Sequence, residues 1–314
     1  MSFNHKHLLD ITEYSADDIM QILETAVAFK QVNERRIKKL PTLKGFTVVN
    51  MFNEPSTRTR SSFEIAEKRL SCDSLNFGGS STSSVKGESL DDTVETLSSY
   101  KIDAVIVRDK RAGVPYKITQ HTNAHVIDAG DGKHQHPTQA LLDLFSIWQR
   151  FGTLEGLKVG VVGDIGHSRV CGSLIPALKI MGATVVVIAP PTLLPARPDI
   201  LGADYVSNSL DEVLPELDVV YMLRIQRERL EGAPYPSLRE YNQLYGLTRD
   251  REHLMKPEAV ICHPGPINRG VELDSYMADH PERSLILDQV YSGILTRMAV
   301  LYLLLGGSND GLSA

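Results

Sequence analysis

A run of five residues combines hydroxyl and guanidinium side chains: Ser56, Thr57, Arg58, Thr59 and Arg60. It follows an apolar, strand-like segment (46–52) and opens a segment whose apolar residues recur with helical spacing. The start of a helix offers unpaired backbone N–H groups and a partial positive charge, which suit a phosphate group. A serine helix cap with surface arginines is the alternative interpretation. Because capping does not require two arginines and two threonines, the run favours phosphate binding.

Further polar residues stand in loops that follow strand-like segments. They are Arg108 after 104–107, His136 before a helix predicted over 137–151, Arg169 after 163–168, and Arg224 and Gln226 after 219–222. A guanidinium group binds a carboxylate through two parallel hydrogen bonds, so these arginines suit an acidic substrate. An isolated arginine after a strand more often forms a surface salt bridge, and the positions alone leave that alternative open.

Three other kinds of site are not favoured by the spacing. The loop 163–166 lacks the complete GxGxxG pattern, and no acidic residue ends the next strand (184–188), so NAD binding is not expected. His134 and His136 have no third metal ligand grouped nearby, which favours a cap or a substrate contact over a metal site. No GxSxG motif indicates a serine hydrolase. We therefore predict neither a cofactor nor a metal.

Short apolar strands alternate with helices in both halves of the chain. Strands are predicted at 46–52, 104–107, 126–128, 158–162, 184–188, 219–222 and 259–262, and a C-terminal helix over 284–305. This alternation predicts an α/β protein with two domains, each a parallel sheet flanked by helices. Ligands of such folds bind outside the carboxyl ends of the strands, where the polar residues described above stand.

Composition excludes several classes of protein. At 314 residues with 42% hydrophobic and 23% charged residues, the chain can form two ordinary cores and is not disordered. A net charge of −6 argues against a nucleic-acid partner, although a local group of cations can still bind a small anion. Three scattered cysteines indicate reduced thiols, and the longest apolar run (298–305) is too short to span a membrane. We expect a soluble, cytoplasmic protein.

The motifs together resemble those of the transcarbamoylase family. Residues 56–60 are similar to its carbamoyl-phosphate motif, residues 136–139 (His-Pro-Thr-Gln) match its HPxQ motif, and Arg108 is a third match. The similarity extends along nearly the whole chain. The segment 263–270 (His-Pro-Gly-Pro-Ile-Asn-Arg-Gly) resembles the aspartate-specific members, and the HCLP and SMG loops of the ornithine-specific members do not occur.

The resemblance implies a role for each matched residue. The phosphate group would be held by Ser56, Thr57, Arg58 and Thr59, with Arg60 nearby. Donors to the carbonyl oxygen of carbamoyl phosphate would be Thr59, Arg108 and His136, with His136 not acting as general base. The carbamoyl amide would be oriented by Gln139 and the backbone carbonyls of Gly265 and Pro266. The aspartate site would contain Lys86, Arg169, Arg224 and Gln226.

The resemblance also implies how the chain is organised. Residues 1–142 would bind carbamoyl phosphate, with a helix over 288–306 packing back on them, and residues 143–287 would bind aspartate. Long interdomain helices would join the two domains, and a pocket between them would hold both substrates. In a homotrimer with shared active sites, a loop containing Ser83 and Lys86 would reach the site of the adjacent subunit. A regulatory chain or a dihydroorotase is a possible further partner.

The implied activity is transfer of the carbamoyl group of carbamoyl phosphate to the α-amine of L-aspartate, in de novo pyrimidine (UMP) biosynthesis. The products are N-carbamoyl-L-aspartate and phosphate, and the amine attacks directly, without a covalent enzyme intermediate. Two alternatives remain open at this point: a transcarbamoylase acting on ornithine or N-acetylornithine, and a non-catalytic scaffold homologue.

Overall fold

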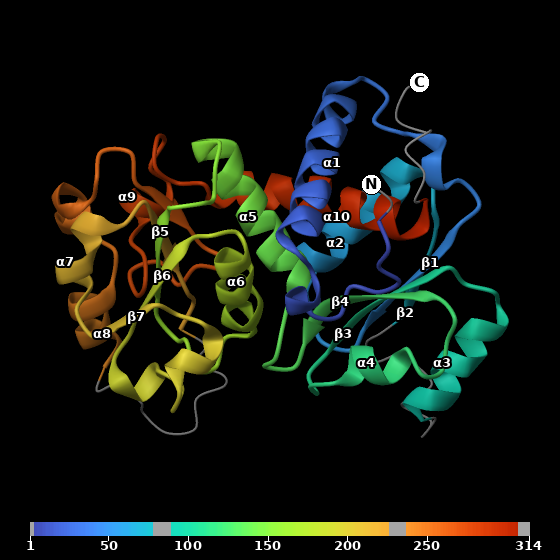
Figure 1. The fold of residues 1–314 in the computed structure, drawn as a ribbon, viewed down its shortest axis with the longest axis horizontal. Helices are drawn as coiled ribbons and strands as arrows, with labels where there is room; N and C mark the ends of the chain where they lie inside the picture. Colours follow the sequence, from blue (N-terminus) through green and yellow to red (C-terminus); the bar gives the residue numbers. More distant parts are fainter. Residues whose placement is uncertain (1–2, 78–88, 226–236, 307–314) are drawn as a thin grey trace. The chain divides into compact units, whose positions relative to one another are not determined.

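The computed structural model describes residues 3–77, 89–225 and 237–306 of the chain. It divides into two compact units: unit 1 comprises Met1–Leu142 and Tyr291–Ala314, and unit 2 comprises Asp143–Val290. Each unit contains one parallel β-sheet flanked by helices, which confirms the predicted fold class (Figure 1). Two long helices, α5 (Pro137–Phe151) and α10 (Ile286–Leu305), contain residues of both units.

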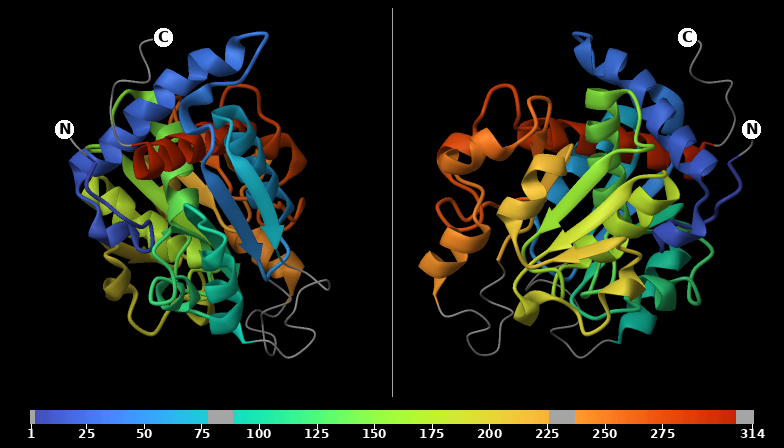
Figure 2. Two further views of the ribbon diagram at one scale, coloured as in Figure 1. Left: turned by 90° about the vertical axis from the view of Figure 1, so that its right-hand side faces the viewer. Right: turned by 60° about the vertical axis from the view of Figure 1, so that its left-hand side comes forward.

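The sheet of unit 1 has the strand order β2-β1-β3-β4, with all neighbours parallel (Figure 2, left). The strands are β1 (Thr47–Phe52), β2 (Asp73–Phe77), β3 (Ala104–Asp109) and β4 (His125–Asp131). From β1 the chain passes to β2 on one side, and from β3 it passes to β4 on the other. The carboxyl ends of β1 and β3 therefore form the switch point at which parallel sheets bind ligands.

Helices cover both faces of this sheet (Figure 1). On one face α3 (Leu90–Ser99) and α4 (Val114–Ile118) bury an apolar cluster that includes Val49, Met51, Val94, Leu97, Val105, Val107, Ile118 and Val126. On the other face lie α1 (Ala16–Glu34), α2 (Thr57–Leu70) and α10, and Asn50 Nδ2 of β1 donates to Glu67 Oε2 of α2 at 3.0 Å. The alternation of inward side chains along each strand places Asn50 and Val49 on opposite faces.

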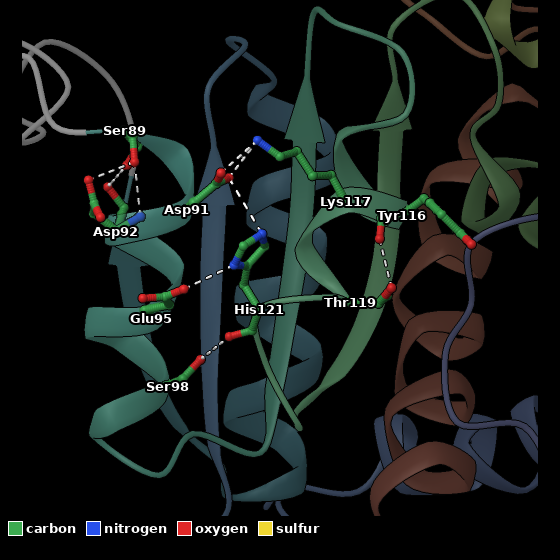
Figure 3. A network of polar contacts seen from close by, with 10 residues as sticks. Ser89, Asp91, Asp92, Glu95, Ser98, Tyr116, Lys117, Thr119 and His121 are labelled. Carbon is green, nitrogen blue, oxygen red and sulfur yellow. Dashed lines mark hydrogen bonds and ion pairs between the residues drawn. The ribbon is translucent and has the colours of Figure 1, made fainter.

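An ion pair joins α3 to α4, and a contact between a histidine and a carboxylate joins α3 to the turn that follows α4 (Figure 3). Lys117 Nζ lies 2.6 Å from Asp91 Oδ1, and His121 Nδ1 lies 3.0 Å from Glu95 Oε1. Ser89 caps α3 by accepting a hydrogen bond from the backbone N–H of Asp92 at 3.1 Å. These contacts hold the first turn of α3 through side chains of this unit alone.

The sheet of unit 2 has the strand order β7-β6-β5-β8-β9, again all parallel (Figure 2, right). Its strands are β5 (Lys158–Val162), β6 (Thr184–Ile188), β7 (Tyr205–Ser207), β8 (Val219–Met222) and β9 (Val260–Cys262). Its helices are α6 (Arg169–Ile180), α7 (Leu210–Val213), α8 (Leu238–Tyr245) and α9 (Ser275–Ala278). The switch point of this sheet lies between the carboxyl ends of β5 and β8.

Short 3₁₀ helices occupy several of the connections in both units. They are Ile11–Glu13, Pro41–Leu43, Pro191–Leu193, Pro198–Leu201, Leu214–Glu216 and Arg249–Leu254. Within the described ranges, no helix is both long and apolar enough to cross a lipid bilayer.

Apart from shifts of a few residues at the ends of elements, the structure differs from the expected strands at two strands and one residue. β2 and β7 were not predicted, because both are edge strands with largely exposed side chains and therefore no apolar run. Arg108 was expected just after a strand but lies within β3. The pairing of β3 with β1 extends as far as Arg108. Phe52 and Arg108 are register partners, and Asn53 N–H donates to Arg108 O at 2.9 Å.

Candidate active site

The turn between β1 and α2 leaves the start of α2 without a cap from its own side chains. Ser56 occupies the N-cap position, but its side chain makes no cap hydrogen bond to the described residues, and the first turn contains no acidic residue. The first helical bond is donated by Arg60 N–H to Ser56 O at 3.2 Å. The N–H groups of Thr57, Arg58 and Thr59 therefore have no acceptor within the helix, and they carry the positive end of its dipole.

The two arginines of this turn are in different electrostatic states. Arg60 Nε lies 2.9 Å from Glu64 Oε1 in an i,i+4 ion pair. Arg58 is exposed, and within the part of the chain that the structure describes no carboxylate pairs with it. Thr59 is only 6% exposed. An anion at the start of α2 would therefore meet the Arg58 charge unneutralised, whereas Arg60 already has a counter-ion.

Arg108 links the ends of three strands of unit 1. Its backbone carbonyl accepts from Asn53 N–H, as described above, and one terminal nitrogen of its guanidinium donates to Ala129 O of β4 at 3.1 Å. Its Nε lies 3.3 Å from Glu54 Oε2, in an ion pair whose two side chains are each 14% exposed. Arg108 is thus held beside the turn that carries Arg58.

His136 stands where the loop after β4 enters α5. Its carbonyl accepts from Gln139 N–H at 2.9 Å and Ala140 N–H at 3.3 Å, which makes His136 the first residue of the helical bonding pattern. Pro137 at the next position has no N–H to satisfy, as suits a helix start. The side chains of His136 and Gln139 are both buried. The loops after β1 and β4 and the end of β3 thus place Arg58, His136 and Arg108 at one edge of the sheet.

In unit 2, a close approach of two strand ends defines the turn after β5. Gly163 has φ +126°, and a Cβ built on it would lie 3.0 Å from Leu223 O, so a side chain there would collide with the chain leaving β8. Leu223 N–H donates to Val162 O at 2.8 Å. The residues that follow these two ends, Arg169 at the start of α6 and Arg224 after β8, are therefore carried by adjacent strands.

The start of α6 resembles that of α2 in lacking a cap but differs in burial. Ser168 is the N-cap residue and makes no side-chain cap hydrogen bond to the described residues, and the first turn contains no acidic residue. Arg169 is 5% exposed, in contrast to the exposed Arg58. In the preceding loop the buried Asp164 Oδ1 lies 2.7 Å from His167 Nδ1.

A buried hydrogen-bond network holds the loop after β9. Gly265 N–H donates to His263 Nδ1 at 2.8 Å, which places the imidazole proton on Nε2, and Nε2 lies 3.3 Å from Glu272 Oε1. Glu272 Oε1 also accepts from Asn268 N–H at 2.6 Å. Asn268 Nδ2 in turn donates to the carbonyl of Ile225 at 3.1 Å. One carboxylate thereby connects the Gly265–Pro266 turn, whose peptide bond is cis, with the residue next to Arg224.

The same network continues into the core of unit 2. His263 N–H donates to Gln289 Oε1 at 2.9 Å, and Gln289 Nε2 donates to Asp143 Oδ1 at 2.7 Å. Tyr221 OH donates to the other Asp143 oxygen at 2.6 Å. Burial raises the pKa of Tyr221 well above its usual value, so the phenol stays a donor at neutral pH. The side chains of His263, Glu272, Gln289, Asp143 and Tyr221 are all buried and hydrogen-bonded, which gives a rigid base for the loop.

Neither cysteine of unit 2 is suited to act as a nucleophile. Burial raises the pKa of Cys171 to about 12 and that of Cys262 well above its usual value, so both are thiols at neutral pH. Among the described residues, no three His, Cys, Asp or Glu side chains are grouped in a way that could hold a metal ion.

The predicted site residues thus fall into two sets, and three lie outside the described residues. Unit 1 carries Ser56, Thr57, Arg58, Thr59, Arg108, His136 and Gln139. Unit 2 carries Arg169, Arg224, Gly265 and Pro266. Outside the described residues lie Ser83, Lys86 and Gln226. Sequence reasoning missed Glu54, Asn268 and Glu272 as residues that hold site residues in place, although Glu54 stands beside the 56–60 run and Asn268 lies within the 263–270 segment.

Fold and site define an α/β protein with polar and cationic residues gathered at the carboxyl edges of two parallel sheets. Two family models match the chain: "Aspartate/ornithine carbamoyltransferase, carbamoyl-P binding domain" over residues 6–149, and the corresponding "Asp/Orn binding domain" over 155–304. The chain belongs to the aspartate/ornithine carbamoyltransferase family.

Relatives and solved structures agree with this membership. The chain is 52% identical to the aspartate carbamoyltransferase catalytic subunit of Syntrophotalea carbinolica, over 98% of this chain and 97% of the relative. It is 47% identical to that of Desulforapulum autotrophicum, over 99% of each chain. The fold is similar to aspartate transcarbamoylase of Trypanosoma cruzi in complex with carbamoyl phosphate and aspartate (TM-score 0.87, 29% identity, 96% and 97% covered). It is also similar to the M. jannaschii catalytic subunit (TM-score 0.83, 34% identity, 96% and 98% covered).

Proposed function

We propose that this chain transfers the carbamoyl group of carbamoyl phosphate to the α-amine of L-aspartate, forming N-carbamoyl-L-aspartate and phosphate in pyrimidine biosynthesis. The observation that carries the proposal is the start of α2: no described side chain caps it, and the exposed Arg58, which pairs with no described carboxylate, stands at the same sheet edge as Arg108 and His136. The curated relatives are named for this reaction, and a structural neighbour holds both of these substrates.

Unit 1, together with its segment of α10, binds carbamoyl phosphate. The phosphate oxygens accept from the N–H groups of residues 57–59, from the hydroxyls of Ser56, Thr57 and Thr59, and from Arg58. Arg108 and His136 donate, with Thr59, to the carbonyl oxygen. Gln139 and the carbonyls of Gly265 and Pro266 orient the carbamoyl amide. His136 acts as a hydrogen-bond donor in this scheme. We therefore expect His136→Ala to lower the turnover number more than it lowers the affinity for carbamoyl phosphate.

The chemical step needs no nucleophile from the chain. The lone pair of the aspartate amine forms a bond to the carbonyl carbon, and the bond from that carbon to the phosphate oxygen breaks, with the electron pair leaving on phosphate. The amine loses one proton, which the departing phosphate is able to accept. Negative charge grows on the carbonyl oxygen, where fixed donors stabilise it. Orienting two bound reactants can contribute about 7–11 kcal/mol of barrier reduction.

Unit 2 binds L-aspartate. Arg169 and Arg224, carried by the adjacent strands β5 and β8, are planar cations that suit two carboxylates. The hydrogen-bond network of His263, Glu272 and Asn268 supports this assignment, since it fixes the chain next to Arg224. Gln226 and Lys86 complete the aspartate site.

The protein is a cytoplasmic homotrimer in which Ser83 and Lys86 complete the site of an adjacent subunit. Mixed trimers of Arg58→Ala and Lys86→Ala subunits test this arrangement, because one site in such a trimer would contain neither substitution. Recovery of activity on mixing supports shared sites, and properly folded mixed trimers without activity would contradict them. Co-purification of the trimer with a regulatory chain or a dihydroorotase would test whether either protein is a partner.

The proposed reaction is tested by measuring carbamoyl transfer from carbamoyl phosphate to aspartate, ornithine and N-acetylornithine. We expect product with aspartate alone and inhibition by a phosphonate–dicarboxylate bisubstrate analogue. Transfer to ornithine or N-acetylornithine instead would assign a different amino-acid substrate. Stoichiometric substrate binding with negligible turnover would assign a scaffold role.

A further inference from the structure

A segment far from His136 in sequence lies along the strand that leads to it. Leu8 N–H donates to Val126 O at 2.9 Å, and Asp128 N–H donates to Leu8 O at 2.8 Å, so residues around Leu8 pair with β4 as a parallel bridge. Val126 N–H also donates to His7 Nδ1 at 3.0 Å. The 7–12 segment therefore runs beside β4 toward its carboxyl end, where the loop to His136 begins.

At that end the segment forms hydrogen bonds with both the nitrogen and the oxygen of the Gln135 side-chain amide. Gln135 Nε2 donates to Asp10 Oδ1 at 2.6 Å, and Ile11 N–H donates to Gln135 Oε1 at 3.0 Å. The backbone carbonyl of Gln135 accepts from Asp131 N–H at 2.9 Å, which closes the loop after β4. Gln135 is 3% exposed, and its side chain and main chain are thus held from opposite directions.

The acceptor in this contact is itself immobilised. Asp10 Oδ1 accepts from Thr12 N–H at 2.8 Å and from Thr12 Oγ1 at 2.7 Å, in addition to Gln135. A charged acceptor makes shorter and stronger hydrogen bonds than a neutral one. The hydrogen bond to Asp10 therefore restricts the movement of the Gln135 side chain.

Gln135 is the neighbour of His136, and Cα atoms joined by a trans peptide are about 3.8 Å apart, so movement of one backbone moves the other. We propose that Asp10, Ile11 and Gln135 form a clamp that sets the position of the His136 imidazole, with Asp10 and Gln135 as positioning residues. The inference rests on the proposed function, in which His136 donates to the carbonyl oxygen of carbamoyl phosphate. The clamp fixes the backbone before His136, and α5 fixes the backbone after it. The imidazole is therefore presented from one backbone conformation.

The test first removes and then reverses the donor and acceptor at the contact between Gln135 and Asp10. Gln135→Glu sets two carboxylates against each other at the Asp10 contact, and we expect turnover to fall by about 10²-fold, the scale of a 1 Å misplacement. The dissociation constant of carbamoyl phosphate changes much less than turnover, because the phosphate site at α2 is untouched. Adding Asp10→Asn supplies an amide donor to the new carboxylate, so the double variant Asp10→Asn/Gln135→Glu recovers most of the lost turnover.

A matched control removes a different bond to the same oxygen. Thr12→Val deletes the Oγ1 hydrogen bond to Asp10 but leaves the Thr12 N–H bond that still holds Asp10, and it leaves the Gln135 contact, so we expect turnover close to wild type. Wild-type turnover in Gln135→Glu, no recovery in the double variant, or an equal loss in Thr12→Val would each overturn the clamp.

A second readout does not depend on the reaction. In histidine-labelled protein, the imidazole NMR signals of His136 shift in Gln135→Glu, return toward wild type in the double variant and stay in place in Thr12→Val. Unshifted His136 signals in folded Gln135→Glu would overturn the clamp even if turnover fell. If the wild-type chain does not carbamoylate aspartate, the proposed function fails, whereas these signals still decide whether the clamp positions His136.

Discussion

Two helices of unit 1, α2 and α3, both begin after a serine, yet their first turns are satisfied in different ways. Ser89 accepts from Asp92 N–H, and Asp91 and Asp92 place negative charge at the start of α3. Ser56 makes no such bond to the described residues, no acidic residue stands in the first turn of α2, and Arg58 adds positive charge to the positive end of this helix. By stability alone α2 is the poorer helix start. The difference indicates that α2 leaves its donors for an anionic ligand.

The largest effect is expected where an unneutralised cation is removed from the start of α2. Arg58→Ala lowers kcat/KM by about 10²–10³-fold, because the charge that meets the phosphate is lost. Arg60→Ala is the matched control in the same turn: it removes a residue already paired with Glu64 and costs about 0.3–0.5 kcal/mol of stability. Steady-state kinetics and urea unfolding of both variants decide this, and equal losses of activity would contradict the distinction.

The next effect extends the comparison to unit 2, where the arginine site is supported by buried hydrogen bonds. Asn268→Ala leaves the Ile225 carbonyl without its donor, at a cost of about 1–3 kcal/mol, and raises KM for aspartate about tenfold. Carbamoyl-phosphate binding, measured by calorimetry, stays at the wild-type value.

Glu252→Gln serves as the control for Asn268→Ala. Like Glu272, Glu252 contacts a histidine of unit 2: its Oε1 lies 3.0 Å from His280 Nε2. Unlike Glu272, it stands before β9 and not in the chain that follows β9. We expect its KM for aspartate to match wild type. A rise equal to that of Asn268→Ala would mean that the network acts through general stability alone.

A smaller effect separates the two serines directly. Ser89→Ala removes a cap and lowers the free energy of unfolding by about 1 kcal/mol, with little change in activity. Ser56→Ala leaves that free energy within about 0.5 kcal/mol of wild type and weakens carbamoyl-phosphate binding. Chemical denaturation and ligand titration check both, and a larger stability loss in Ser56→Ala would mean that α2 is capped after all.

A final effect, seen only below neutral pH, concerns the hydrogen bond between His7 and β4. Burial, aided by Lys6 and His125, lowers the pKa of His7 to about 4 from 6.5. Between these pH values the unfolded chain binds a proton that the folded chain does not, so stability falls as pH drops from about 6.5 to about 4. We expect the urea midpoint to decline over this window, and to decline less in His7→Asn, whose side-chain oxygen accepts without titrating. Equal declines would contradict a role for His7.

Much of the fold follows from local sequence, and much of the support for the site does not. The buried strands β5 and β6 are runs of apolar residues and are readily predicted, whereas the exposed edge strands β2 and β7 lack that signal. The 56–60 run was recognisable because all its chemistry is contiguous.

The contacts that hold site residues in place join distant parts of the chain. Gln135 and Asp10 are 125 residues apart, and Asn268 and Ile225 are 43 apart. Neither pair shows a spacing or a composition from which its contact could be inferred. The burial of Arg169 against the exposure of Arg58 is likewise a result of packing, because both residues stand in the first turn of a helix whose N-cap residue is a serine.

The most direct test of the central claim, that the start of α2 keeps its donors for an anion, is a backbone amide NMR titration with carbamoyl phosphate. We predict that the amide signals of Thr57, Arg58 and Thr59 shift on binding, because these N–H groups gain acceptors. The amides of Leu90, Asp91 and Asp92, at the capped start of α3, serve as the internal reference and stay in place. Saturable binding that leaves residues 57–59 unshifted would contradict the account.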